Sequence, residues 1–126
     1  MKIIIGKVLG CFIFLLASAK CFSQESDWRF DYKPLDAGYG LYSGELSDPR
    51  PAEKSGSSIS IKIEKQAAKE IFDQMGSDLP NACPSEAGER MRKNNDLVCY
   101  KKRSAQYICY VGIDLKSGKS KIGVIC

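Results

Sequence analysis

Hydrophobic and polar positions alternate most regularly over residues 58–64, where three isoleucines alternate with polar side chains. This period of two predicts a β-strand with one buried face. Residues 38–46 alternate small and bulky side chains and predict another strand, whose glycines weaken it or mark bulges. The prolines, glycine and charges of residues 48–57 predict a loop. Residues 24–36 are polar with scattered aromatics and predict an arm or a short edge strand.

After residue 64, the spacing of apolar residues changes to that of an α-helix. Residues 65–75 carry one apolar stripe at helical spacing, which predicts a helix that covers the sheet. Gly76 supplies a stop signal, and Pro80 prevents the helix from resuming. The stripe consists of Ala67, Ala68, Ile71, Phe72 and Met75.

The last forty residues predict three or four antiparallel strands joined by short turns. The expected strands are 89–93, 97–101, 106–115 and 119–126. With turns at residues 103–105 and 117–118, Cys99 lies opposite Cys109, and Cys109 lies opposite Cys126. Both hairpins then place their apolar residues on one face, and a slip of one residue would destroy that agreement.

These elements predict an α+β fold: a single small domain in which one helix packs on one face of an antiparallel sheet. We expect about five to six strands and two disulfides. The domain is expected to span residues 24–126, which is close to the commonest single-domain size.

The start of the chain has the pattern of a secretory signal peptide. Two lysines within residues 1–7 precede an apolar run at residues 8–17 and then small residues, and the run is too short to span a bilayer. Cleavage after Ser23 removes Cys11 and Cys21 and leaves an even number of cysteines, whereas cleavage after Ala19 leaves five. We therefore expect an exported protein, periplasmic or secreted, with neither a membrane span nor a lipid anchor.

Four cysteines remain in the expected mature chain: Cys83, Cys99, Cys109 and Cys126. In the predicted meander, Cys99 and Cys126 flank Cys109 on opposite sides, about 9–10 Å apart, which is beyond the reach of a disulfide. Two pairings stay open: 83–99 with 109–126, which we favour slightly, and 83–126 with 99–109. A metal or redox site is disfavoured, because the chain has no histidine and no C-x-x-C pair.

Catalytic chemistry has little support in this sequence. The lack of histidine removes the commonest general base. The sequence SGKS at residues 117–120 lacks the upstream glycines of a phosphate loop and is expected to be a hairpin turn. We expect no enzyme, no catalytic residue and no cofactor. The acidic residues outside the strong elements form no identifiable pair; they are Asp27, Asp31, Asp36, Glu45, Asp48 and Glu53.

Charge is distributed unevenly along the expected mature chain. Residues 24–86 carry 7 basic and 12 acidic side chains, and residues 87–126 carry 9 basic and 3 acidic side chains. The two parts attract each other within one fold, or the basic part faces an acidic partner such as an anionic glycan. No nucleic-acid recognition motif is present, so we expect no nucleic-acid partner.

The predicted register leaves tyrosines on the sheet face opposite the cysteines. Tyrosine beside lysine suits protein contact or sugar stacking. A loop or the N-terminal arm, with Trp28 and Phe30, is the alternative account of what lies on this face. Tyr39 and Tyr42 form a second, weaker candidate. The expected contact residues are Tyr100, Tyr110, Ile108, Lys102 and Lys121.

The resulting hypothesis is a soluble, exported, non-enzymatic binding protein that contacts a protein or glycan in the cell envelope. Periplasmic inhibitors and immunity proteins share its small size, export, two disulfides and lack of a catalytic set, although no motif links it to them. The alternatives are a small cell-envelope hydrolase or lyase that uses carboxylates, and an accessory component of an envelope assembly.

Overall fold

A computed structural model describes residues 28–54, 56–80, 82–83 and 87–126. The expected signal peptide, its cleavage site and Asp27 lie outside the described residues. Contacts divide the chain into Met1–Asp31 and Tyr32–Cys126, and the fold is that of the second unit.

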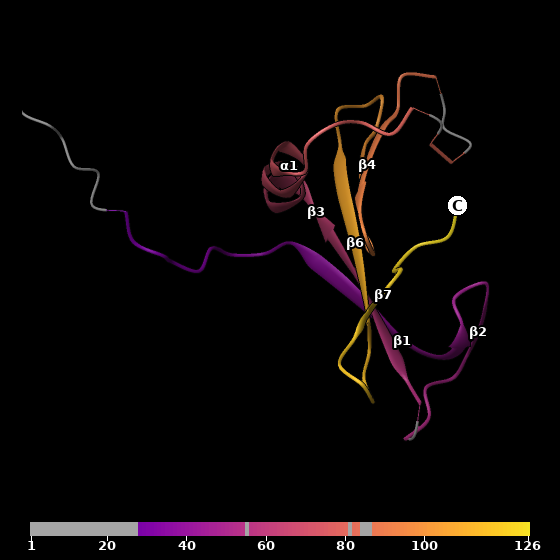
Figure 1. Ribbon diagram of the computed structural model, residues 1–126. Helices are drawn as coiled ribbons and strands as arrows, with labels where there is room; N and C mark the ends of the chain where they lie inside the picture. The colour runs from indigo at the N-terminus through magenta and orange to yellow at the C-terminus, as the bar shows by residue number, and fades with distance from the viewer. Residues whose placement is uncertain (1–27, 55, 81, 84–86) are drawn as a thin grey trace, which may run out of the picture. The chain divides into compact units, whose positions relative to one another are not determined.

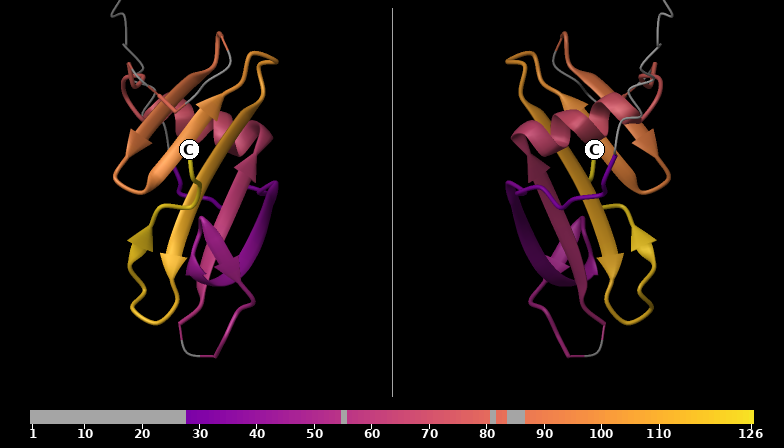
Figure 2. Two further views of the ribbon diagram at one scale, coloured as in Figure 1. Left: turned by 90° about the vertical axis from the view of Figure 1, so that its right-hand side faces the viewer. Right: turned by 90° about the vertical axis from the view of Figure 1, so that its left-hand side faces the viewer.

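The described residues form one antiparallel sheet of seven strands with a single helix on one face (Figure 1). The strand order is β2-β1-β3-β6-β5-β4, and the short β7 pairs with β6. In Figure 2, α1 lies in front of the sheet in the right-hand view, and the C-terminal segment lies in front of it in the left-hand view. The elements are β1 (Ala37–Glu45), β2 (Asp48–Arg50), β3 (Ser58–Glu64), α1 (Lys65–Gln74), β4 (Arg90–Asn94), β5 (Leu97–Lys101), β6 (Tyr107–Asp114) and β7 (Ser120–Lys121).

The single helix, the antiparallel sheet and the two disulfides are confirmed, and the strand number is higher than expected. Seven strands lie within the described ranges, which are mostly sheet, so the label α+β fits only loosely. One additional strand, β2, lies within residues 48–57, which we expected to be a loop. It is short and lies at the edge of the sheet, a position where its proline is tolerated. Residues 28–36 form no strand.

The predicted order of the last strands is wrong, because β3 occupies the side of β6 that we assigned to residues 119–126. β3 pairs with β6 along its whole length, from Ser58 opposite Asp114 to Glu64 opposite Ile108. β7 instead shares the other edge of β6 with β5. β5 occupies that edge from Tyr107 to Tyr110, so β7 ends after two residues.

The register of the last hairpin also differs from the prediction. Ile113 lies opposite Ser120 rather than Ile122. The carboxylate of Asp114 accepts hydrogen bonds from the backbone N–H groups of Lys116 (3.1 Å) and Ser117 (2.8 Å). Gly118 adopts the left-handed conformation (φ 71°). These features close a four-residue turn that the sequence pattern did not reveal.

Helix α1 confirms the predicted apolar stripe. Ala68 and Phe72 are buried, and Met75, which caps the C-terminus, is buried with them. Gly76 follows in the left-handed conformation (φ 81°), as expected for a residue just past a helix end. The buried cluster beneath α1 also contains Cys99 and Cys109.

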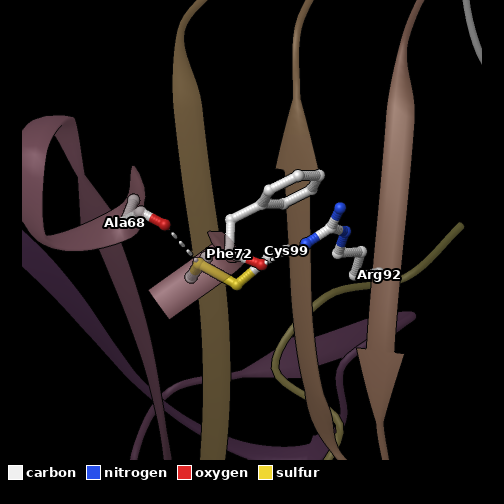
Figure 3. Close-up of a disulfide and its surroundings, with 5 residues drawn as sticks. Ala68, Phe72, Arg92 and Cys99 are labelled. Atoms are coloured by element: carbon white, nitrogen blue, oxygen red, sulfur yellow. Dashed lines mark hydrogen bonds between the residues drawn. A yellow bond between two sulfur atoms is a disulfide. The ribbon is translucent and has the colours of Figure 1, made fainter. Parts of the chain in front are cut away.

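The disulfide between Cys99 and Cys109 lies under the helix (Figure 3). The two cysteines are directly opposite on β5 and β6, as predicted, with their Cα atoms 4.0 Å apart. The Cys109 sulfur lies 3.5 Å from the carbonyl oxygen of Ala68. The guanidinium of Arg92 donates a hydrogen bond to the Phe72 carbonyl (2.7 Å) and lies 4.2 Å from the centre of the Phe72 ring. Helix α1 thus contacts both the buried disulfide and β4 through Ala68 and Phe72.

Asp78 joins the segment after the helix to β4 through ion pairs with Arg90 and Arg92. These ion pairs make the free energy of unfolding depend on pH. Hydrogen bonds from Arg90 (2.5 Å) and Arg92 (2.8 Å) lower the pKa of its carboxyl from 3.8 to about 2. A lowered pKa means that the ionised carboxylate stabilises the fold above about pH 4, and that this contribution is lost as the pH falls towards 2.

We expect Asp78→Asn to lower the free energy of unfolding at pH 7 and to flatten its pH dependence between pH 4 and 2. Denaturant titrations at several pH values measure both effects. Because the pair is partly exposed, high salt should reduce the difference. An unchanged pH profile would show that Asp78 is not responsible.

Candidate functional site

The C-terminal segment crosses the sheet face opposite the helix. Gly112 on β6 and Gly123 make the crossing possible, because a Cβ on Gly123 would lie 2.7 Å from the Val111 carbonyl carbon, and one on Gly112 would lie 2.6 Å from the Lys121 oxygen. The hydroxyl of Ser60 donates a hydrogen bond to the Gly123 carbonyl (2.6 Å). The segment therefore lies directly on the backbone of β6, as the left-hand view of Figure 2 shows.

A disulfide between Cys83 and Cys126 anchors the end of this segment, with Cα atoms 5.1 Å apart. The pairing that we favoured slightly, 83–99 with 109–126, is wrong, and the other open pairing is present. The physical reason is that Cys109 faces α1, whereas residues 122–126 cross the opposite face. The sheet separates Cys109 from Cys126.

Tyr100 and Tyr110 lie beside this anchored segment. Their rings make an edge-to-face contact with centres 6.3 Å apart, and both residues are half-buried. They line a hollow of about 200 Å³, and the Tyr100 hydroxyl lies 4.0 Å from the Cys83 sulfur. The hollow is lined by Cys83, Glu89, Tyr100, Lys102, Tyr110, Val124, Ile125 and Cys126.

Glu89 supplies a carboxylate at the edge of the hollow, at a position that no sequence pattern marks. Its side chain is only 7 % exposed and forms an ion pair with Lys102. The Lys102 ammonium also lies 5.4 Å from the centre of the Tyr100 ring. Burial raises the pKa of Tyr100, and the negative charge of Glu89 raises it further. Tyr100 is therefore a neutral hydrogen-bond donor at physiological pH.

The structure brings together part of the predicted contact set. Tyr100, Tyr110 and Lys102 line the hollow, and Ile108 lies directly opposite Tyr100 on β6, although it does not line the hollow. Lys121 belongs to β7 and does not line the hollow; its ammonium lies 5.4 Å from the Tyr42 ring centre and 3.3 Å from the Ser58 hydroxyl.

The weaker candidate, Tyr39 with Tyr42, is divided between two faces. Tyr42 is buried at 5 % exposure, whereas Tyr39 is 73 % exposed. Their opposite orientations follow from the alternation of side chains along β1. Trp28 and Phe30 are exposed, and the segment found on the tyrosine face is the C-terminal one.

The acidic residues considered for catalysis that belong to the second unit do not line the hollow. Asp36 pairs with Lys65 at 2.9 Å. Glu45 and Asp48 are opposite each other in the hairpin of β1 and β2, and both are exposed.

A wider groove of about 610 Å³ lies between the start of α1 and the turn from β5 to β6. Tyr107 and three lysines line it. Two of the lysines, Lys65 and Lys69, are engaged with Asp36 and Asp73.

Comparison with known proteins gives no relative. No protein-family model matches this sequence, and neither the curated proteins nor the solved structures contain a significant match. Within the described ranges, no helix has the length and apolarity that a membrane span requires. The same ranges contain no cluster of three or more metal-ligating His, Cys, Asp or Glu side chains.

Proposed function

We propose that this chain is an exported, non-enzymatic binding protein that captures a protein partner through the surface around Tyr100 and Tyr110. The observation that carries the proposal is the pair of half-buried tyrosines fixed beside the anchored C-terminal segment. Export rests on the signal-peptide pattern of the first 23 residues.

Several features of this surface suit protein recognition. Tyrosine combines a large apolar ring with a hydroxyl donor and loses little conformational freedom on binding. Ile125 is 55 % exposed and adds apolar area at the rim. The disulfide between Cys83 and Cys126 limits movement of the C-terminal segment before a partner binds, and this lowers the conformational entropy lost on association.

The experiment is partner capture from envelope extract of the native host with Tyr100→Ser/Tyr110→Ser. We expect the wild-type protein to retain a stoichiometric protein and the double variant to lose it. Truncation of a fully buried aromatic side chain typically costs about 3–5 kcal/mol per residue. Because both rings are only half-buried, each substitution should lower the free energy of unfolding by less than that. A cooperative thermal melt and intact disulfides would show that it remains folded.

Two further variants make the result decisive. Ile125→Asp changes the rim at an exposed position, so it tests the surface even if the double variant fails to fold. Tyr39→Ser removes an exposed tyrosine on the opposite face and should keep the partner. Undiminished capture by Ile125→Asp and the folded double variant would refute the proposal. Turnover of a cell-wall substrate, or retention of a glycan without protein, would favour a different function.

A further inference from the structure

No described residue forms a strand pairing with the outer edge of β1 along residues 37–41. Among the described residues, this stretch pairs on one side with β3, and β2 pairs only from Ser43 onward. Both views of Figure 2 show β1 at the margin of the sheet. The stretch reads AGYGL and contains no charge and no proline.

The direction of the open hydrogen-bonding groups follows from one contact. The N–H of Glu64 donates to the carbonyl of Asp36 (2.9 Å), so Asp36 directs its backbone groups towards β3. In an antiparallel pair this direction alternates with each residue. Gly38 and Gly40 therefore also bond to β3, while Ala37, Tyr39 and Leu41 direct their N–H and C=O groups outward.

The opposite edge of the same sheet is protected. β4 carries Arg90, Arg92 and Lys93, and its Met91 carbonyl accepts a hydrogen bond from the N–H of Leu79 (2.8 Å). Charged side chains and a covering loop are the usual means of preventing strand addition. Among the described residues, neither feature is found at the edge of β1 along residues 37–41.

An apolar surface adjoins the open edge on the helix side of the sheet. Tyr39 is 73 % exposed, and Leu41 and Leu115 are 49 % and 52 % exposed. The register places Ile59 and Ile61 of β3 next to Leu41 and Tyr39, on the same face. This part of the face carries no charged side chain on β1 or β3.

We propose that residues 37–41 pair with the same residues of a second copy of this chain, in an antiparallel two-fold dimer. With Tyr39 on the axis, Ala37 of one copy lies opposite Leu41 of the other. All the outward N–H and C=O groups of these three residues then find partners. The two apolar surfaces become continuous, and no like charges meet at the axis.

The length of the edge also fits a second copy. β1 begins at Ala37, and β2 occupies the edge from Ser43. Each copy therefore has an open stretch of the same length, residues 37–41, and the two stretches can pair along their whole length. The tyrosine surface of the proposed function lies on the opposite face, so either proposal can fail without the other.

The test uses the full exported chain over a range of protein concentrations. We expect light scattering to show a monomer that becomes a dimer as concentration rises. Amide hydrogen exchange resolved by residue should show concentration-dependent protection of Ala37, Tyr39 and Leu41. Gly38 and Gly40 should be protected at every concentration, since their N–H groups bond within the monomer.

Two variants test the contact itself. Tyr39→Lys places two like charges opposite each other and should weaken dimerisation at least about tenfold. Tyr39→Pro removes an outward N–H and no bond to β3, so it should weaken the dimer while the monomer stays folded. Leu79→Lys is the matched control and should dimerise as the wild type does, because Leu79 is an exposed apolar residue beside β4 at the opposite edge of the sheet.

Other occupants of the edge give different results. A monomer at all concentrations overturns the proposal. If the amides of Ala37, Tyr39 and Leu41 are already fully protected in the monomer, another segment of the same chain pairs with this edge. That result would also overturn the dimer proposal. So would a dimer that Tyr39→Lys leaves unchanged.

Discussion

Replacing Phe72 with alanine is expected to lower the free energy of unfolding by about 3–5 kcal/mol. The Phe72 side chain is 1 % exposed, so its removal leaves a cavity between α1 and the buried disulfide. Arg92 would also lose the ring beneath its guanidinium, and Tyr107 would lose an edge-to-face contact at 5.4 Å. Equilibrium denaturation of the oxidised protein measures the loss.

Leu115→Ala is the matched control for this prediction. Leu115 is 52 % exposed, so the substitution should change stability by no more than about 0.5 kcal/mol. Equal losses in the two variants would mean that α1 does not hold the core through Phe72.

Replacing Gly123 with alanine is expected to displace the C-terminal segment from the sheet. The added Cβ would lie 2.7 Å from the Val111 carbonyl carbon and 2.9 Å from the Gly112 nitrogen, and these are backbone atoms that cannot rotate away. Overpacking of this kind typically costs about 1–3 kcal/mol. The hydrogen bond from Ser60 to Gly123 should also be lost. Denaturant unfolding measures the stability, and solvent exposure of Tyr110 reports the displacement.

Gly38→Ala separates this steric effect from a general effect of replacing glycine. A Cβ on Gly38 meets nothing within 4 Å, and the residue lies in a strand. Loss of backbone freedom in the unfolded chain should make this variant as stable as the wild type or slightly more stable. If Gly123→Ala behaved in the same way, the close crossing over β6 would be wrong.

The strands and the helix were largely predictable, because each signal is local. The alternating isoleucines gave β3 with its observed bounds, and the apolar stripe gave α1. The hairpin of β5 and β6 was correct in register, because slipping it by one residue would have buried polar side chains.

The strand order was not predictable from the same signals. The pairing of β3 with β6 joins segments separated by the helix and by β4 and β5, and no pattern in either segment specifies the other. The length of β7 depended on that pairing, because β5 and β7 had to share one edge of β6. The error in the neighbour of β6 placed Cys126 opposite Cys109, whereas Cys126 pairs with Cys83.

The candidate site was predictable only in part. Alternation along β5 and β6 placed Tyr100 and Tyr110 on one face. The crossing of the sheet by residues 122–126 was missed, because apolar residues in this segment alternate as they do in a β-strand. The signal that could have revealed it is the pair Gly112 and Gly123, since glycine permits two backbones to approach closely. Glu89 was missed because its burial results from tertiary packing.

The most direct test of the binding role is photo-crosslinking from the site itself. Tyr100 is replaced by the photoreactive residue p-benzoylphenylalanine, and the protein is irradiated in envelope extract of the native host. The same residue at the exposed position Leu115 serves as the control. We predict a stoichiometric crosslink to one partner protein from position 100, and no crosslink to that protein from position 115. A crosslink to that protein from position 115 alone, or none from position 100 while the wild-type chain captures it, would contradict the account.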